Sequence, residues 1–196
     1  MKYIGLDAGS VAVKIIVLND KRLILDSTYL RHKGRPLHTS LELLKKSANQ
    51  LSGEDTSLSL TGSAGRLIGI ILGITPVNEV VAHAYATRKL YPKVKTIIEL
   101  GGEDSKLIFL DKASCSAKDF AMNSVCAAGT GSFLDQQAER LNLSIEEFSR
   151  LSLESRKPPR IAGRCSVFAK SDMIHLQQIA TEQADDGTVG LGAEAA

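Results

Sequence analysis

Two cysteines, Cys126 and Cys165, stand in settings that suit the ligation of a large inorganic group. Cys126 is followed by Ala-Ala-Gly-Thr-Gly, so no bulky side chain obstructs its thiol, and both cysteines come shortly before a predicted helix. The partial positive charge of a helix N-terminus favours an anionic group at that position. We therefore interpret the two stretches as candidate ligand loops. The alternative is that both thiols are small, buried, apolar side chains.

The helices behind these cysteines are predicted from their apolar periodicity. A capping box of Ser132 and Asp135 is expected to open the first helix. The apolar stripe of the first helix is Leu134, Ala138 and Leu141, and that of the second is Ala169, Met173, Leu176 and Ala180. Cys126 and Cys165 belong to no C-x-x-C pair, which argues against a zinc knuckle. Cys115 lies in a polar segment and is interpreted as a spare thiol.

A second kind of chemistry is indicated by two segments that repeat one pattern. Residues 6–18, LDAGSVAVKIIVL, and residues 98–110, IELGGEDSKLIFL, each have an acid, a glycine two places later and a lysine seven places after the acid. The matched positions are Asp7 with Glu99, Gly9 with Gly101, Ser10 with Gly102, and Lys14 with Lys106. This repetition predicts two structurally related halves, each with a glycine turn at the tip of a β-hairpin.

Glycine turns of this kind suit phosphate binding, because backbone N–H groups can approach the phosphate oxygens closely. Asp7, together with Glu103 and Asp104, is a candidate to hold Mg²⁺ directly or through its waters. A single hairpin would be an ordinary turn, whereas two in matching frames favour a nucleotide site. No G-x-x-x-x-G-K-[ST] motif occurs, so a P-loop is excluded, and the G-T-G at 129–131 lacks the third glycine of a dinucleotide fingerprint.

Glu79 and His83 lie four residues apart and are predicted to share one face of a helix. The alternative is a surface acid and a packed histidine. Their position between the two hairpins keeps them as candidates.

The elements that must position these residues alternate between strand and helix. Strands are predicted over residues 3–6, 11–18 and 57–61 and in the hairpin of residues 95–110. Helices are predicted over residues 37–51, from Pro76 to about Leu90, and over residues 145–151 behind a capping box of Ser144 and Glu147. Residues 67–74 fit a buried helix or a strand equally well.

Bulk properties limit the class of protein. The 196 residues carry a net charge of +2, which indicates no nucleic-acid or membrane partner. The longest apolar run, residues 67–74, is too short to span a bilayer, and Asp7 falls where a signal peptide needs apolar residues. Three cysteines, an odd number, favour a reducing cytoplasmic location.

Four motifs together resemble those of one family, the ATP-dependent activators of 2-hydroxyacyl-CoA dehydratases. They are similar also to the ATPase subunits of benzoyl-CoA reductase. The motifs are DAGS at 7–10, ELGGEDSK at 99–106, MNSVCAAGTG at 122–131 and RCSVFA at 164–169. The resemblance implies an α/β fold of the actin, heat-shock ATPase and sugar-kinase type, with two related ribonuclease-H-like halves around a nucleotide cleft. The expected halves are residues 1–92, with the first phosphate loop, and residues 93–196, with the second loop and the cluster cysteines. The second half is expected to be incomplete, because the family continues with a further strand and an adenosine-binding Gly-Gly loop.

The resemblance implies that Asp7, Gly9 and Ser10 form the first phosphate loop and that Gly101 and Gly102 form the second. The residue patterns above complete the expected site. The expected catalytic residues are Asp7, Glu79 and Asp104. The expected MgATP-binding residues are Gly9, Ser10, Lys14, Gly101, Gly102, Glu103 and Lys106. Cys126 and Cys165 are expected to ligate a four-iron four-sulfur cluster, and because such a cluster takes four thiolates, one cluster is expected per homodimer. Position 99 is aspartate in many family members. The glutamate in this chain moves the carboxylate by one methylene.

The implied function is ATP-dependent transfer of one electron. The expected partner is a 2-hydroxyacyl-CoA dehydratase or an acyl-CoA reductase component, with reduced ferredoxin or flavodoxin as the electron donor. One alternative is a sugar or acyl-group kinase of the same fold without a cluster, which iron content would distinguish. Another is a nucleotide-binding module without turnover.

Overall fold

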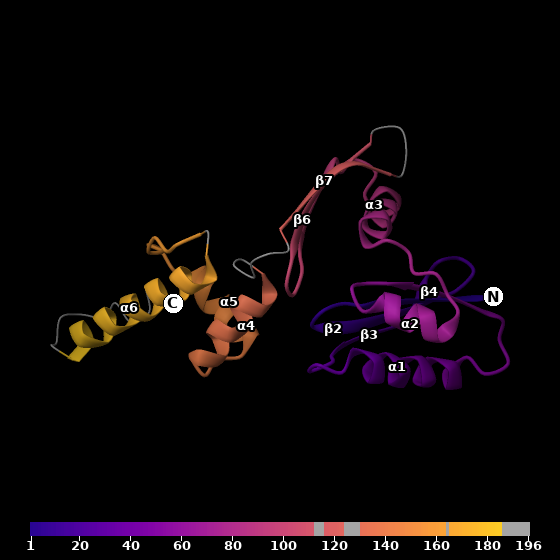
Figure 1. Cartoon of the computed structure of the whole chain (residues 1–196), viewed down its shortest axis with the longest axis horizontal. Helices are drawn as coiled ribbons and strands as arrows, with labels where there is room; N and C mark the ends of the chain where they lie inside the picture. The colour runs from indigo at the N-terminus through magenta and orange to yellow at the C-terminus, as the bar shows by residue number, and fades with distance from the viewer. Residues whose placement is uncertain (112–115, 124–129, 164, 186–196) are drawn as a thin grey trace. The chain divides into compact units, whose positions relative to one another are not determined.

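The computed structural model describes residues 1–111, 116–123, 130–163 and 165–185 (Figure 1). By their contacts these residues form two units, one made of residues 1–102 and 106–122 and the other of residues 103–105 and those from 123 onward. The two predicted halves, 1–92 and 93–196, stay a prediction. No helix in the described ranges is long and apolar enough to cross a bilayer.

The first unit begins with a four-stranded sheet in the order β3-β2-β1-β4. Its strands are β1 (Lys2–Ala8), β2 (Ala12–Leu18), β3 (Ile24–Arg31) and β4 (Thr56–Thr61). The predicted hairpin is confirmed, since β1 and β2 pair antiparallel with Asp7 opposite Lys14. β4 is parallel to β1, and helix α1 (Pro36–Gln50) lies in the connection between β3 and β4.

One face of this sheet forms the larger apolar core. Alternate residues of β1 and β2 pack there against helices α1 and α2, and burying a side chain such as Leu6, Leu60 or Ile68 stabilises the fold by about 1.5–3 kcal/mol. Helix α2 (Gly65–Leu72) shows that residues 67–72 are helical, and Gly73 ends the helix in the left-handed conformation. Asp7 and Lys14 alternate with these core positions and so face away from them.

A second sheet in the first unit has the order β5-β6-β7. Its strands are β5 (Thr96–Leu100), β6 (Ser105–Leu110) and β7 (Ala117–Asn123). Helix α3 (Glu79–Leu90) packs on β6 through Ala84, which is buried with Ile108 and Leu110.

The prediction that Pro76 opens α3 is wrong. Asn78 caps the helix, because its side chain accepts hydrogen bonds from the N–H groups of Val80 and Val81. The N–H of Val77 donates to the Leu60 carbonyl, which holds this residue beside β4 instead of in the helix. Glu79 is therefore a first-turn residue of α3, at the positive end of the helix.

The second unit contains helices α4 (Gly131–Arg140), α5 (Ile145–Glu154) and α6 (Ser166–Asp185). The predicted capping box of Ser144 and Glu147 is confirmed at the start of α5. That of Ser132 and Asp135 is wrong, since Ser132 lies inside α4 and the N-cap residue is Thr130. The predicted stripe of α4 is also partly wrong. The helix buries Phe133, Gln137 and Ala138, whereas Leu134 is 42% exposed.

Candidate functional site

The first candidate group lies at the end of the β1–β2 hairpin. Lys14 Nζ lies 2.7 Å from Asp7 Oδ2, and both side chains reach solvent, at 47% and 28% exposure. The turn beyond them is tight, because the Gly9 N–H donates to the Ala12 carbonyl. An exposed ion pair of this kind is weak, so a phosphate or a cation can replace either partner at small cost.

Gly62 shapes the other side of Asp7. It follows β4 with φ of 93°, and a Cβ on it would overlap Asp7 Oδ1 and the Ala8 carbonyl. The N–H of Ala64 donates to the Ala8 carbonyl at 2.8 Å, so the turn after β4 closes over the end of β1. Asp7 Oδ1 is buried there and has no hydrogen-bond partner in the described part of the chain. An unsatisfied buried carboxylate oxygen is costly, which favours a ligand at this position.

The importance of Gly62 was not predicted from the sequence. The available signal was a strand followed at once by Gly-Ser-Ala-Gly.

The second candidate group is built on the β5–β6 hairpin and α3. Lys106 Nζ lies 2.8 Å from Glu99 Oε2, which reproduces the Asp7 and Lys14 pair at the matched positions of the repeat. The same ammonium lies 3.3 Å from Glu79 Oε2. The Lys106 side chain is 4% exposed, whereas Glu79 and Glu99 are 28% and 17% exposed. A buried ammonium is tolerated because the carboxylates compensate its charge.

His83 joins this second group from the same face of α3 as Glu79. Potential ligand atoms of Glu79, His83 and Glu99 all lie within 4.8 Å of one another. That spacing would suit a metal ion, but the Lys106 ammonium already contacts both carboxylates. A divalent cation would have to approach this buried positive charge, so we do not assign a metal to these residues.

Within the first unit, Gly102 lies close to the first glycine turn. A Cβ on Gly102 would overlap the Val11 side chain and lie 3.0 Å from Ser10 Oγ. Gly102 of the second turn therefore lies against Ser10 and Val11 of the first. Gly101, Glu103 and Asp104 belong to the connection between β5 and β6.

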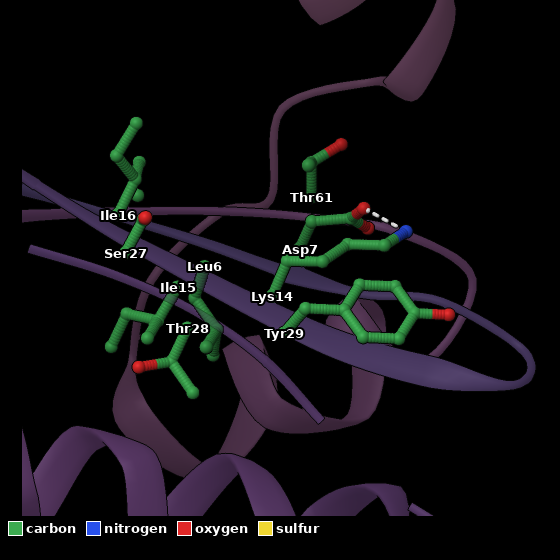
Figure 2. A pocket seen from close by; sticks show the side chains of 10 residues that line it. Leu6, Asp7, Lys14, Ile15, Ile16, Ser27, Thr28, Tyr29 and Thr61 are labelled. Carbon is green, nitrogen blue, oxygen red and sulfur yellow. Dashed lines mark hydrogen bonds and ion pairs between the residues drawn. The ribbon is translucent and has the colours of Figure 1, made fainter. Parts of the chain in front are cut away.

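A cavity of about 460 Å³ opens beside the Asp7 and Lys14 pair (Figure 2). Figure 2 shows the Tyr29 ring alongside the Lys14 side chain, as expected for residues paired across β2 and β3. Most of the cavity lining comes from mid-strand positions such as Gly5 and Ile16, and not from the turn at residues 9–10. The cavity is thus mainly apolar and is charged only at the end that carries Asp7 and Lys14.

Of the predicted cluster cysteines, the structure describes only Cys165. Its thiol is free and half-buried, and its carbonyl accepts the first helical hydrogen bond of α6 from the Ala169 N–H, at 2.9 Å. The prediction that this thiol stands directly ahead of a helix is confirmed. Cys126 and Cys115 lie outside the described residues.

Comparison with known proteins gives consistent matches along the chain. The BadF/BadG/BcrA/BcrD ATPase family matches residues 4–185. The (R)-2-hydroxyglutaryl-CoA dehydratase activating ATPase of Acidaminococcus fermentans is 31% identical over 185 residues, which are 93% of this chain and 70% of that protein. The 2-hydroxyisocaproyl-CoA dehydratase activator of Clostridioides difficile is 32% identical over 182 residues, which are 91% of this chain and 67% of that protein.

A solved structure agrees with these matches. The activator of the 2-hydroxyisocaproyl-CoA dehydratase from Clostridium difficile, with bound ADPNP, superposes with a TM-score of 0.77 at 30% identity. The match covers 98% of this chain and 70% of that one. The predicted fold class, an α/β fold of the actin and sugar-kinase type, is confirmed.

Proposed function

Because this chain belongs to the BadF/BadG/BcrA/BcrD ATPase family, we propose that it hydrolyses ATP to drive the transfer of one electron to a 2-hydroxyacyl-CoA dehydratase or a related acyl-CoA reductase. The observation that carries the proposal is the pair of matched hairpins. Each places a carboxylate and a lysine behind a glycine turn, and the turn at Gly102 contacts Ser10 and Val11 of the other. Two such turns offer backbone N–H groups to one chain of phosphates.

The described residues fit a bound MgATP. Asp7 has one buried oxygen without a partner among these residues, and glycines at 62 and 102 stand where a Cβ would overlap the loops. We assign phosphate and Mg²⁺ contacts to Gly9, Ser10, Lys14, Gly101, Gly102 and Glu103, and catalytic roles to Asp7, Glu79 and Asp104. Bound MgATP would supply the phosphoryl group that water attacks.

Phosphoryl transfer needs little covalent chemistry from the protein. These residues would therefore act by positioning the reactants and by stabilising their charges. Asp7 would hold Mg²⁺ directly or through its waters. The Lys14 ammonium would leave the Asp7 carboxylate and contact a phosphate oxygen instead. Glu79, at the N-terminus of α3 and 28% exposed, would orient the attacking water.

For electron transfer we assign Cys126 and Cys165 as ligands of a four-iron four-sulfur cluster shared by a homodimer. Cys165 fits this role, because a free, half-buried thiol at the start of α6 is accessible to a ligand and lies in a positive field. A cluster held by four thiolates would supply a one-electron centre. Reduced ferredoxin or flavodoxin would be its electron donor.

Anaerobic purification followed by assays of iron, sulfide, molar mass and ATP hydrolysis tests the proposal. We expect a dimer with about four iron atoms per two chains and measurable ATP turnover. Turnover without iron would instead support a kinase-like relative, and iron-free protein that binds ATP without turnover would support a nucleotide-binding module. Either result overturns the proposed function.

A further inference from the structure

The two hairpin lysines occupy matched positions in the repeat but have different environments. Lys14 is 47% exposed and contacts one carboxylate, that of Asp7. Lys106 is 4% exposed and contacts the carboxylates of both Glu79 and Glu99. The Lys14 ammonium can therefore change its partner more easily than the Lys106 ammonium can.

Lys106 is poorly suited to bind a phosphate. To reach an incoming nucleotide, its ammonium would have to leave two carboxylates, which would then lie side by side without compensation. Breaking a buried ion pair in this way costs far more than exchanging the partner of an exposed one. Lys14 can make that exchange, because its ion pair with Asp7 is open to solvent on both sides.

Lys106 is instead well placed to orient Glu79. It connects the first turn of α3 to strands β5 and β6, two segments that are separate in the sequence. Its ammonium lies 3.3 Å from Oε2 of Glu79, whose side chain is 28% exposed and so reaches solvent. A glutamate held by one oxygen has fewer orientations for the other, and an attacking water requires one orientation.

We infer that Lys106 is a positioning residue, which holds Glu79 against the second hairpin for ATP hydrolysis, and that Lys14 alone of the two lysines contacts the phosphates. The inference rests on the proposed ATPase function. It gives different roles to Lys14 and Lys106, which occupy matched positions in the repeat. Glu99 then serves as the second carboxylate that holds the Lys106 ammonium in place.

The test compares Lys106→Met with Lys14→Met, using Lys46→Met on the exposed face of α1 as the matched control. Affinity is measured by calorimetry with a non-hydrolysable ATP analogue, and kcat by steady-state ATP hydrolysis. Lys14→Met should weaken affinity by about 10-fold to 100-fold, as expected for loss of a charged hydrogen bond. Lys106→Met should lower kcat by about 100-fold and leave affinity near the wild-type value.

Because Lys106→Met leaves two carboxylates together, it is paired with Lys106→Met/Glu99→Gln, which removes the surplus negative charge. This double variant should show the same loss of kcat. In a Glu79→Gln background, Lys106→Met should add little further loss, since the carboxylate that it positions is absent.

The possible failures are distinguishable. Wild-type protein that neither binds nor hydrolyses ATP overturns the proposed function and the inference with it. Active wild-type protein in which Lys106→Met loses affinity as strongly as Lys14→Met overturns only the inference. Full additivity of Lys106→Met with Glu79→Gln overturns it as well.

Discussion

Gly62 lies so close to the carboxylate of Asp7 that any side chain at this position would overlap Asp7 Oδ1. The contact is made possible by parallel pairing of β4 with β1, which places Thr61 beside Asp7 and the following turn over the strand end. The position of the proposed catalytic carboxylate therefore depends on a residue without a side chain.

We expect Gly62→Ala to destabilise the fold and abolish ATP hydrolysis. The substitution combines an unfavourable φ of 93° with displacement of Asp7. Gly53→Ala is the matched control, because Gly53 has φ of 84° and a Cβ added to it would meet no atom within 4 Å. Urea unfolding should show a loss of about 1 kcal/mol for Gly53→Ala and clearly more for Gly62→Ala. Equal losses with retained hydrolysis would show that the Asp7 contact is unimportant.

Asp7→Ala should separate activity from stability. Its ion pair with Lys14 is exposed, so losing it costs about 0–1 kcal/mol, and removing the unsatisfied Oδ1 offsets part of that cost. ATP hydrolysis should nevertheless be abolished, because the substitution removes the carboxylate proposed to hold Mg²⁺ behind the first turn. The measurements are urea unfolding and ATP turnover on the same preparation. Wild-type turnover in Asp7→Ala would contradict a catalytic role for this residue.

Glu147 should make α5 sensitive to acid. Its pKa lies below the ordinary value of 4.5, because the Ser144 N–H and hydroxyl donate to the carboxylate and Arg150 adds a favourable charge. A lowered folded-state pKa means that the contribution to stability is present above about pH 4.5 and is lost as the pH falls through the folded value. Glu147→Gln should therefore be less stable than wild type near pH 7 and equally stable at the acidic end. Denaturant unfolding across this range tests it, and a pH-independent difference would contradict it.

The local part of the site could be predicted from the sequence. The spacing of seven between acid and lysine, with a glycine between them, predicts a hairpin whose two charged residues face each other. Asp7 with Lys14 and Glu99 with Lys106 show this arrangement. Both pairs depend only on a turn and on the alternation of side chains along two adjacent strands.

The remaining contacts depend on tertiary pairing, which no local pattern encodes. Glu79 meets Lys106 only because α3 packs on β6, and Gly62 meets Asp7 only because β4 pairs with β1. Strands β3 and β7 were not predicted, since β3 is largely exposed on both faces and β7 is largely exposed along its length. Neither offers the apolar alternation that identifies a strand.

Gly102→Ala should separate the two glycine turns. A Cβ there would overlap the Val11 side chain and approach Ser10 Oγ, so the loops would have to move apart. We expect weaker binding of ATP and of ADP alike, because both carry the phosphates that we propose to lie between the turns. Calorimetry with both nucleotides tests this, with Gly163→Ala as the control, since a Cβ there would meet no atom within 4 Å in the part of the chain that the structure describes. Unchanged affinity in Gly102→Ala would contradict the assignment of this turn to phosphate binding.

Cys165→Ser should remove iron without unfolding α6. The Cys165 carbonyl accepts the first hydrogen bond of this helix, so residue 165 is the N-cap position, where serine is a preferred residue. The substitution thus keeps or improves the cap while replacing the proposed thiolate ligand with a weakly binding hydroxyl. Cys126→Ser should also lose iron, whereas Cys115→Ser should keep it. Iron and sulfide assays on anaerobic protein, with circular dichroism to confirm helix content, decide the matter, and full iron occupancy in Cys165→Ser would refute the assignment of the cluster to this cysteine.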